Sequence, residues 1–488
     1  MELKIKLLKW SAGLPVAMLN KKTAEKIGVH TKERISIKTK TKEIHTILDT
    51  IVGLVKNNEI AVSSEIQKRL SLKNNQKVEV ILASSPKSLK YIKLKLNKKV
   101  LSEKQINEII KDVVNNSLSE AEIALFVSAM YRHGMNKKET IYLINAILKS
   151  GNKLKLKNKF IVDKHSIGGI PGNRTTPLVV SICAATGLMM PKTSSRAITS
   201  AAGTADVIET IAQIDFSIKE LEKIVKKTNA CMVWGGGLGM VPADSKIIQI
   251  EKILKIDPEA QLLASIMSKK LAVGSKYILI DIPYGKSAKV NKQKALKLKK
   301  KFEYLGKHFK RKLKVVLTKG SEPIGNGIGP VLETIDILKI LDPKQQGPDD
   351  LEKKSVFLAG ELLEMTGKAK KNNGEKLAKE ILDSGKAFEK FKEIIKAQNG
   401  NLKKLAPAKF KKEIKSKKSG KIKHIDNKKI NSLARSAGCP MDKSAGLYLH
   451  VHVGTKVKRN QKILTIYAES KSRLKQAIKF YKKEKPIR

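Results

Sequence analysis

The spacing of hydrophobic and polar positions changes from one region of the chain to the next. Within residues 1–85, apolar side chains alternate with polar ones in ERISIKT, HTILDTIVGLV and KVEVILAS, which predicts strands. The segment KTAEKIGV has the spacing of a short helix. We therefore expect a small β-rich N-terminal domain.

In residues 86–154 the apolar positions recur with helical periodicity, and three amphipathic helices are predicted between Lys99 and Lys149. Ser102 and Ser119 are each followed three residues later by Gln or Glu. This spacing is that of a capping box, so both serines are predicted to begin a helix.

Strands, glycine loops and helices alternate from residue 155 onward. FIVDKHSIGG, NACMVWGGGLG, SKYILIDIPYG and LKVVLTKGSEPIGNG each predict a strand that runs into a loop, and TTPLVVSICAATG, DVIETIAQI and DPEAQLLASIMSKKLA predict helices. This alternation indicates an α/β sheet. The Lys-rich stretch 400–424 is expected to be a linker, and GLYLHVHVG and QKILTIYAE predict strands of a small β-rich C-terminal module.

The composition is that of a multidomain globular protein. A chain of 488 residues with 41% hydrophobic content is expected to form about three or four domains with real cores. The longest apolar run, near 178–190, is too short to span a bilayer, and the N-terminus MELKIKLLKW has no apolar signal region. Cys183, Cys231 and Cys439 are far apart and lack metal-site spacing, which favours reduced thiols in a cytoplasmic protein.

The formal net charge of +54 raises the question of nucleic-acid binding. Only about ten of the 99 basic residues are arginine, and the lysines are spread over every segment without interleaved aromatic residues. Nucleic-acid surfaces concentrate arginine and stacking aromatics, so specific nucleic-acid binding is not expected. The positive field would still attract small anionic substrates.

Two loops have the composition of anion sites. In residues 163–173, DKHSIGGIPGN, a strand ends in Gly168, Gly169 and Gly172, which free the backbone N–H groups to face an anion. In residues 192–206, KTSSRAITSAAGTAD, six hydroxyls, one Arg and one Lys precede a helix. The alternatives are a plain glycine turn and a Ser/Thr-rich turn with a helix cap, and His165 alone fits a structural hydrogen bond as well as catalysis.

A third candidate surface follows Ile256. Asp257 precedes Pro258, which fits an N-cap with proline at the first helical position. Ser265 and Lys269 follow at steps of eight and four residues, so the three polar side chains share one helical stripe. The pattern alone leaves open whether this stripe is a helix cap or a catalytic surface.

Taken together and in this order, KHSIGGIPGN, PKTSSRAITSAAGTAD, WGGGLGMVPAD and LLASIMSKKLAVGS resemble the archaeal AMP phosphorylases, within the thymidine phosphorylase family of nucleoside phosphorylases. The resemblance covers nearly the whole chain. It implies phosphorolysis of AMP to adenine and ribose 1,5-bisphosphate, with CMP and UMP as further substrates, in archaeal AMP salvage. It implies no metal or cofactor, and a homodimer or a higher homo-oligomer.

The resemblance also implies roles for individual residues. Asp257 would donate a proton to the leaving base, and Lys164 and Ser166 would lie around the phosphate together with Ser195 and Thr204. The wider pyrimidine enzymes have an arginine where this chain has Ile256, which favours AMP-type over thymidine-type specificity. His165 and Lys269 are further candidates. The residues implied in substrate binding are Gly169, Ser195, Arg196, Ala197, Ile198, Thr199, Ser200, Thr204, Ser265 and Lys289.

The implied fold class is α/β multidomain: a small β-rich N-terminal domain, a mainly helical domain, a large α/β domain with a central mixed sheet, and a small β-rich C-terminal module. The loop SEPIGNGIGP fits a closing segment or a simple strand–helix turn. The expected segments are 1–85, 86–154 and 241–273 (helical domain), 155–240 and 274–415 (α/β domain), and 416–488 (C-terminal α+β module).

Three other functions remain open from the residues. A pyrimidine nucleoside phosphorylase would act on nucleosides without the 5′-phosphate. A phosphoribosyltransferase of the anthranilate type would need diphosphate with Mg²⁺ and acidic residues to hold it. A nucleic-acid-binding protein would bind duplexes in a salt-dependent manner.

Overall fold

The chain folds into two compact units, each built from two separate stretches of sequence. Unit 1 comprises Met1–Gly151 and Val241–Ser268, and unit 2 comprises Asn152–Met240 and Lys269–Arg488. The division into six segments stays a prediction. The residues that the computed structural model describes are 1–8, 10–11, 15–197, 200–402 and 405–488.

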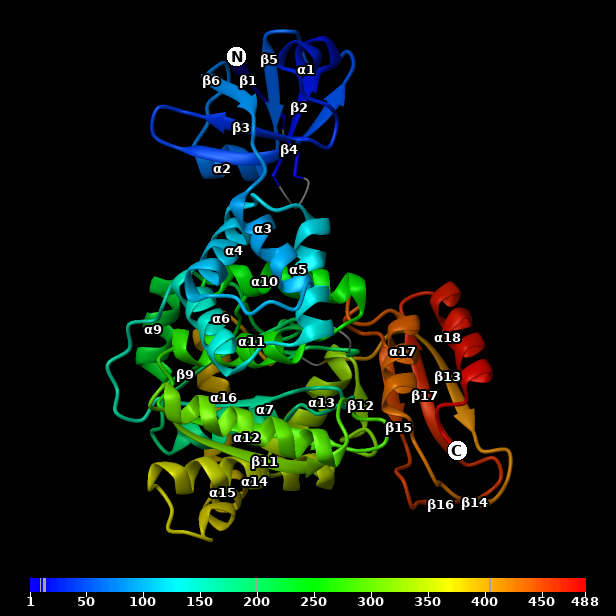
Figure 1. Cartoon of the computed structure of the whole chain (residues 1–488). Helices are drawn as coiled ribbons and strands as arrows, with labels where there is room; N and C mark the ends of the chain where they lie inside the picture. The colour runs from blue at the N-terminus through cyan, green and yellow to red at the C-terminus, as the bar shows by residue number, and fades with distance from the viewer. Residues whose placement is uncertain (9, 12–14, 198–199, 403–404) are drawn as a thin grey trace. The chain divides into compact units, whose positions relative to one another are not determined.

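The N-terminal part of unit 1 is a closed six-stranded barrel (Figure 1). Its elements are β1 (Glu2–Leu7), β2 (Val16–Asn20), α1 (Lys21–Ile27), β3 (Arg34–Lys38), β4 (Glu43–Ile51), β5 (Glu59–Val62), α2 (Ser64–Leu70) and β6 (Lys77–Leu82). The strand order is β1-β5-β2-β4-β3-β6, with parallel pairs β1–β5 and β2–β4 and antiparallel pairs elsewhere. Alternate residues such as Leu3 and Ile5 are buried, which confirms the predicted strand pattern.

The rest of unit 1 is helical. Its helices are α3 (Lys87–Leu96), α4 (Glu103–Asn115), α5 (Glu120–His133), α6 (Lys137–Lys149), α10 (Pro242–Leu254) and the first part of α11 (Glu259–Ala272). Ser102 and Ser119 form the predicted capping boxes, because each side chain accepts from the N3 backbone N–H while the N3 side chain accepts from the cap's own N–H. Lys95 and Glu139 form a buried ion pair at 2.8 Å that joins α3 to α6.

Unit 2 contains the predicted α/β region. Its strands are β7 (Val162–Ser166), β8 (Met190–Ser194), β9 (Ala230–Trp234), β10 (Tyr277–Tyr284) and β11 (Lys312–Lys319). The pairs β7–β10, β10–β11 and β8–β9 are all parallel, and a parallel bridge from Ile161 to Met189 joins the two sets. The parallel pairing follows from the helical crossovers between these strands. The strands of the barrel pair in both directions.

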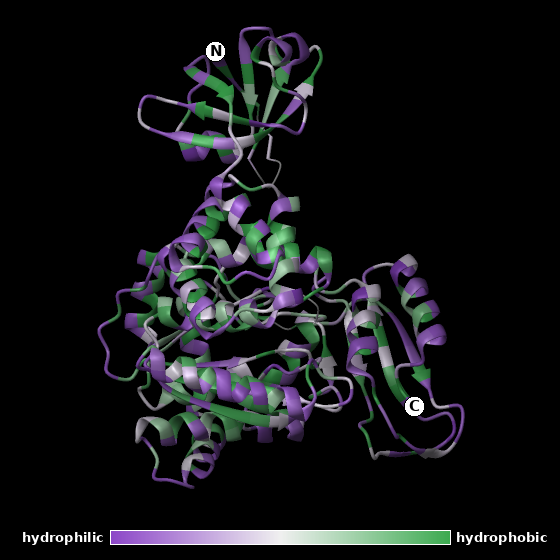
Figure 2. Cartoon of the chain, viewed as in Figure 1, coloured by the Kyte–Doolittle hydropathy of each residue, from purple (hydrophilic) through white to green (hydrophobic). Residues whose placement is uncertain are grey.

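Helices surround these strands and contribute a large apolar core (Figure 2). They are α7 (Thr175–Ala185), α8 (Thr204–Ile208), α9 (Ile218–Thr228), α12 (Lys292–His308), α13 (Pro330–Leu341), α14 (Asp349–Thr366), α15 (Gly374–Asp383) and α16 (Lys386–Ala397). The helix expected over DVIETIAQI is wrong in extent. The structure has α8, which ends at Ile208, because the apolar residues after it enter the core from a turn.

The C-terminal module combines a sheet with two helices. Its elements are β12 (Gly327–Ile328), β13 (Phe410–Lys415), β14 (Gly420–Lys421), α17 (Asn427–Ala437), β15 (Gly446–Leu449), β16 (Lys456–Val457), β17 (Lys462–Ala468) and α18 (Lys471–Glu484). The sheet order is β12-β15-β17-β13. The linker expected at 400–424 is therefore wrong in part, because Phe410–Lys415 pairs along β17 in place of remaining irregular.

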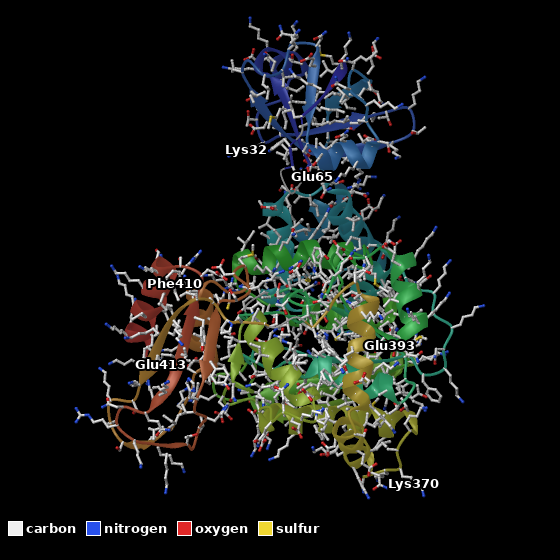
Figure 3. The ribbon with its side chains drawn as sticks, turned by 180° about the vertical axis from the view of Figure 1, so that it is seen from behind. Lys32, Glu65, Lys370, Glu393, Phe410 and Glu413 are labelled. Atoms are coloured by element: carbon white, nitrogen blue, oxygen red, sulfur yellow. The ribbon has the colours of Figure 1, made fainter. Side chains whose placement is uncertain are left out.

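Charged side chains stand over the surfaces of both units, from Lys32 on the barrel to Lys370 in the α/β region (Figure 3). This distribution matches the even spread of lysine along the sequence. Among the described helices none is long and apolar enough to cross a membrane.

Candidate functional site

The glycine loop follows β7 directly and leads into α7. Gly168, Gly169 and Gly172 have positive φ angles of 84°, 95° and 68°, which side-chain-bearing residues rarely adopt. A Cβ added to Gly169 would lie 3.0 Å from the Cβ of Lys289. Gly169 and Lys289, two predicted substrate-binding residues that are far apart in the sequence, therefore lie against each other.

Gly172 fixes the other end of this loop. A Cβ at Gly172 would lie 2.1 Å from the carbonyl oxygen of Ile324, so no larger residue fits without movement of the backbone. The Ile324 N–H in turn donates to the Pro171 carbonyl at 3.1 Å. The segment SEPIGNGIGP thus packs directly on the glycine loop.

The hydroxyl loop between β8 and α8 is closed by one carboxylate. Asp206 Oδ2 accepts from the N–H of Ala197 at 2.7 Å and from the N–H of Gly203 at 2.8 Å. Ser200 Oγ donates to the Ala202 carbonyl at 2.8 Å. The predicted residues Ile198 and Thr199 lie outside the described residues.

Arg174 joins the two loops, and sequence analysis missed it. Its guanidinium donates to Thr204 Oγ1 and to the Ala202 carbonyl, both at 2.8 Å, and to Glu333 at 2.6 Å. Glu333 is almost fully buried, and burial raises its pKa while Arg174 acts in the opposite direction. The only sequence signal was a rare arginine placed directly before α7.

Arg196 has a partner inside the protein. Its guanidinium makes two hydrogen bonds to Glu209, at 2.6 and 2.7 Å, and lies 5.2 Å from the ring centroid of Trp234. These contacts raise the pKa of Arg196 and lower that of Glu209 to about 2. The guanidinium expected to grip an anion is therefore held by this carboxylate in the structure, and its role in binding stays a prediction.

Lys164 lies buried beneath the glycine loop. Its ammonium donates to Thr175 Oγ1 at 2.5 Å, and burial lowers its pKa to about 7 although nearby Asp281 acts in the opposite direction. Ser166 Oγ accepts from the Asn173 amide at 3.4 Å. A lysine that titrates near neutral pH is suited to respond to an arriving anion.

His165, between Lys164 and Ser166, is held neutral. Burial lowers its pKa well below the usual value, and the positive charges of Lys270 and Lys192 act in the same direction. Both lysines surround Asp163, at 2.8 Å for Lys270 and 3.4 Å for Lys192. Asp163, on the strand that leads into the glycine loop, is thus buried between two lysines.

The third candidate surface belongs mainly to unit 1. Helix α11 forms but begins at Glu259, one residue later than the predicted first position Pro258. Asp257 thus lies two residues before the helix, and Ser265 is buried within it. Lys269 lies one turn beyond Ser265 on the same helix and is the first residue of unit 2 in this stretch. Two of the predicted site residues, Asp257 and Ser265, belong to unit 1. Others belong to unit 2, among them Lys164, Ser166, Gly169, Ser195, Thr204 and Lys289.

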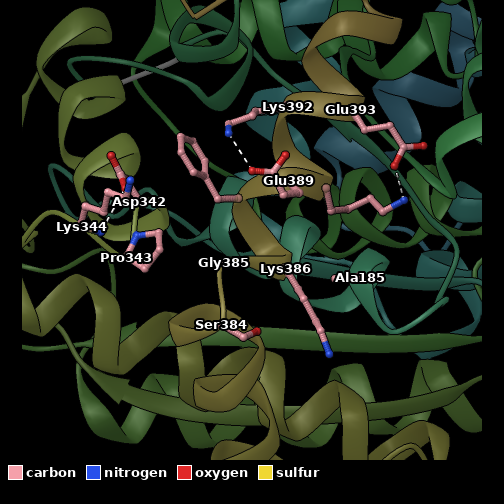
Figure 4. A pocket seen from close by; sticks show the side chains of 12 residues that line it. Ala185, Asp342, Pro343, Lys344, Ser384, Gly385, Lys386, Glu389, Lys392 and Glu393 are labelled. Atoms are coloured by element: carbon pink, nitrogen blue, oxygen red, sulfur yellow. Dashed lines mark hydrogen bonds and ion pairs between the residues drawn. The ribbon is translucent and has the colours of Figure 1, made fainter.

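A separate cavity of about 670 Å³ lies beside α16, lined by Lys386 and neighbouring residues (Figure 4). Four of its charged side chains form two ion pairs, Lys392–Glu389 at 2.7 Å and Lys390–Glu393. It contains none of the predicted site residues. Among the described residues no group of three or more His, Cys, Asp and Glu side chains is placed to hold a metal ion.

Three family models match successive parts of the chain. The glycosyl transferase family helical bundle domain matches residues 89–151, and the glycosyl transferase family a/b domain matches residues 158–388. The pyrimidine nucleoside phosphorylase C-terminal domain matches residues 421–488.

Curated relatives align over the full length. The chain is 43% identical to the AMP phosphorylase of Thermococcus sibiricus, over 100% of this chain and 98% of the relative. It is 43% identical to that of Thermococcus kodakarensis with the same coverage, and 41% identical to that of Methanocaldococcus jannaschii over 97% of this chain and 95% of the relative.

A solved structure shares part of the fold. Anthranilate phosphoribosyltransferase from Thermus thermophilus superposes with a TM-score of 0.53 at 17% identity, covering 63% of this chain and 99% of its own. At this identity the likeness concerns the fold alone.

Proposed function

The chain belongs to the AMP phosphorylase family, and on that premise we propose that it cleaves AMP with inorganic phosphate to adenine and ribose 1,5-bisphosphate. The observation that carries the proposal is the 43% identity to AMP phosphorylases over the full length of the chain. CMP and UMP are proposed as further substrates, and AMP salvage as the metabolic setting.

In this reaction a phosphate oxygen forms a bond to C1′ of the ribose while the C1′–N9 bond to adenine breaks. The electron pair of the broken bond passes to the base, which is a poor anionic leaving group and needs a proton. We assign that proton donation to Asp257, because a carboxyl group is a suitable general acid. The 5′-phosphate takes no part in bond making, so the sugar product carries two phosphates.

Fixed donors around the attacking phosphate supply much of the rate in such a reaction, because they hold the nucleophile in line. We assign this role to Lys164, Ser166, Ser195 and Thr204. Support comes from the contact of Arg174 with Thr204 and from the buried position of Lys164 beside the glycine loop.

We assign nucleotide binding to Gly169, Lys289, Ser265 and residues 195–200. The close approach of Gly169 to the Cβ of Lys289 supports the first two, because it brings the glycine loop against the segment that carries this lysine. His165 and Lys269 are proposed to shape the site electrostatically. Ile256 before Asp257 is proposed to disfavour a pyrimidine nucleoside lacking the 5′-phosphate.

A substrate panel tests the function. With saturating phosphate, kcat/KM for AMP is expected to exceed that for adenosine, uridine and thymidine by about tenfold or more. The nucleosides lack the 5′-phosphate, so they cannot form its charge-assisted hydrogen bonds with the protein. CMP and UMP are expected to react. Activity confined to free nucleosides would overturn the proposal in favour of a pyrimidine nucleoside phosphorylase.

We further propose a homodimer or a higher homo-oligomer in the cytoplasm. Support for assembly comes from exposed apolar side chains in the helical part of unit 1, namely Val100, Leu125 and Tyr131. Support for a reducing compartment comes from the three buried free cysteines. Light scattering coupled to size exclusion measures the assembly directly.

A further inference from the structure

Helix α17 of the C-terminal module contacts three loops of the α/β region through two buried asparagines. Asn427 and Asn431 are four residues apart, so they lie on the same face of the helix. Asn427 is fully buried and Asn431 is 7% exposed. Buried amides are costly unless they are hydrogen-bonded, so their partners are informative.

Asn427 acts as a donor to the loop that carries Lys289 and to Gly320, which follows β11. Its Nδ2 donates to the Gly320 carbonyl at 2.9 Å and to Ser287 Oγ at 3.1 Å, and its backbone N–H donates to the same Oγ at 3.2 Å. Ser287 is itself buried and lies two residues before Lys289. Asn427 therefore ties the start of α17 to the segment that presents Lys289 to Gly169.

Asn431 acts as an acceptor for the hydroxyl loop. Its Oδ1 accepts from the N–H of Ala201 at 2.9 Å. Ala201 is 1% exposed and packs in the apolar core of the C-terminal module, although it belongs to the loop between β8 and α8. The next residue, Ala202, accepts from Arg174, which also donates to Thr204.

A third contact reinforces the same junction. Lys443 of the C-terminal module lies 2.9 Å from Glu209, the carboxylate that holds Arg196 of the hydroxyl loop. The C-terminal module thus contacts the hydroxyl loop directly through Asn431, and through Lys443 it contacts Glu209, the partner of Arg196. None of these partners is a neighbour in sequence, so the contacts form only in the folded chain.

We propose that Asn427 and Asn431 are positioning residues that hold the Lys289 loop and the hydroxyl loop in the geometry that binds substrate. Their kinetic consequence rests on the proposed function. The C-terminal module is in this account part of the active-site scaffold. A displacement of either loop by about 1 Å would lower the rate strongly, because reacting groups must be held in line.

The different hydrogen-bond roles of the two amides give a sharp test. Asn431→Asp keeps an acceptor for the Ala201 N–H, whereas Asn427→Asp loses both Nδ2 hydrogen bonds and puts a carboxylate against the Gly320 carbonyl. Asn427→Ala removes both Nδ2 hydrogen bonds and leaves only the backbone hydrogen bond to Ser287, and Asn431→Ala removes the acceptor for Ala201. Ser432→Ala, on an exposed position of the same helix, is the matched control.

Steady-state kinetics on the full chain should separate the variants. Asn431→Ala, Asn427→Ala and Asn427→Asp are expected to lose about tenfold or more in kcat/KM for AMP and phosphate, while Asn431→Asp and Ser432→Ala stay within about threefold of the wild type. Assays are run well below each variant's melting temperature, so that loss of folded protein does not contribute. Equal kinetics for all five variants, with only the melting temperature lowered, would overturn the proposal.

Hydrogen exchange provides a readout that does not depend on the reaction. The Ala201 amide is expected to exchange faster in Asn431→Ala than in the wild type, and residues 285–290 faster in Asn427→Ala, each without change in the other loop. If the wild-type protein fails to cleave AMP, the proposed function fails alone and this exchange pattern still decides the positioning role. Unchanged exchange in both loops would contradict it.

Discussion

Lys164 is the residue whose surroundings change its chemistry most directly. Burial lowers the pKa of its ammonium to about 7, against the opposing influence of Asp281. At pH 8 the side chain is therefore mainly neutral in the free protein. A phosphate dianion beside it would favour the charged form and raise that pKa.

Phosphate binding at pH 8 is accordingly expected to take up a proton. Calorimetric titration with phosphate in two buffers of different ionisation enthalpy should give different heats for the wild type. Lys164→Met should remove most of this difference. Equal heats for the wild type in both buffers would show that Lys164 does not change its protonation on binding.

A substitution at Asp257 tests the proposed proton donation to the leaving base. Asp257→Asn keeps a side-chain oxygen that can cap a helix but removes the acid. Loss of general acid catalysis should lower kcat about a hundredfold or more with little change in melting temperature. Glu259→Gln, two residues further along, is the control and should retain kcat. If Asp257→Asn also retains its activity, Asp257 is not the proton donor.

The site could be predicted from the sequence only where its residues form local motifs. Gly169 and the hydroxyl loop were identifiable because glycine and hydroxyl runs between a strand and a helix have few other uses. Arg174 was not, because its partners Thr204 and Glu333 are remote in sequence. Nor did the sequence indicate that Arg196 would be held by Glu209, since both fit solvent-exposed positions equally well.

At the scale of elements, the glycine loop depends on two different properties of glycine. Gly168 and Gly172 both have positive φ, at 84° and 68°. A Cβ added at Gly172 would meet the Ile324 carbonyl, whereas a Cβ added at Gly168 would meet nothing within 4 Å. Gly168→Ala is expected to cost about 1 kcal/mol of unfolding free energy for the backbone conformation alone. Gly172→Ala should cost clearly more, because the 2.1 Å approach requires backbone movement.

Denaturant unfolding of the two variants measures this difference. Kinetics should follow the same order, since movement at Gly172 displaces the loop that carries Gly169. Equal destabilisation by the two substitutions would show that the contact with Ile324 does not constrain the loop.

Elements with strong local signals were predictable, and elements that depend on a distant partner were not. The helices that begin at Ser102 and Ser119 formed as expected because their caps lie within four residues. The sequence predicts a linker where β13 lies because four of the six residues in FKKEIK are charged. The strand forms because β17 provides its hydrogen-bonding edge, which no local pattern reveals.

At the scale of the whole molecule, the proposed catalytic and binding residues come from both units. The residues proposed to hold phosphate belong to unit 2, and the proposed proton donor Asp257 belongs to unit 1. The C-terminal module adds support to the loops of unit 2 through Asn427 and Asn431. The parallel strands gather the loops, because their carboxyl ends meet at one edge of a sheet.

The central claim is that this chain transfers the ribose of AMP to phosphate and not to water. The direct measurement is adenine release from AMP with and without inorganic phosphate, with the sugar product identified by phosphorus NMR. We expect release to require phosphate and to yield one ribose 1,5-bisphosphate per adenine. Adenine release in the absence of phosphate, or ribose 5-phosphate as the sugar product, would contradict the account.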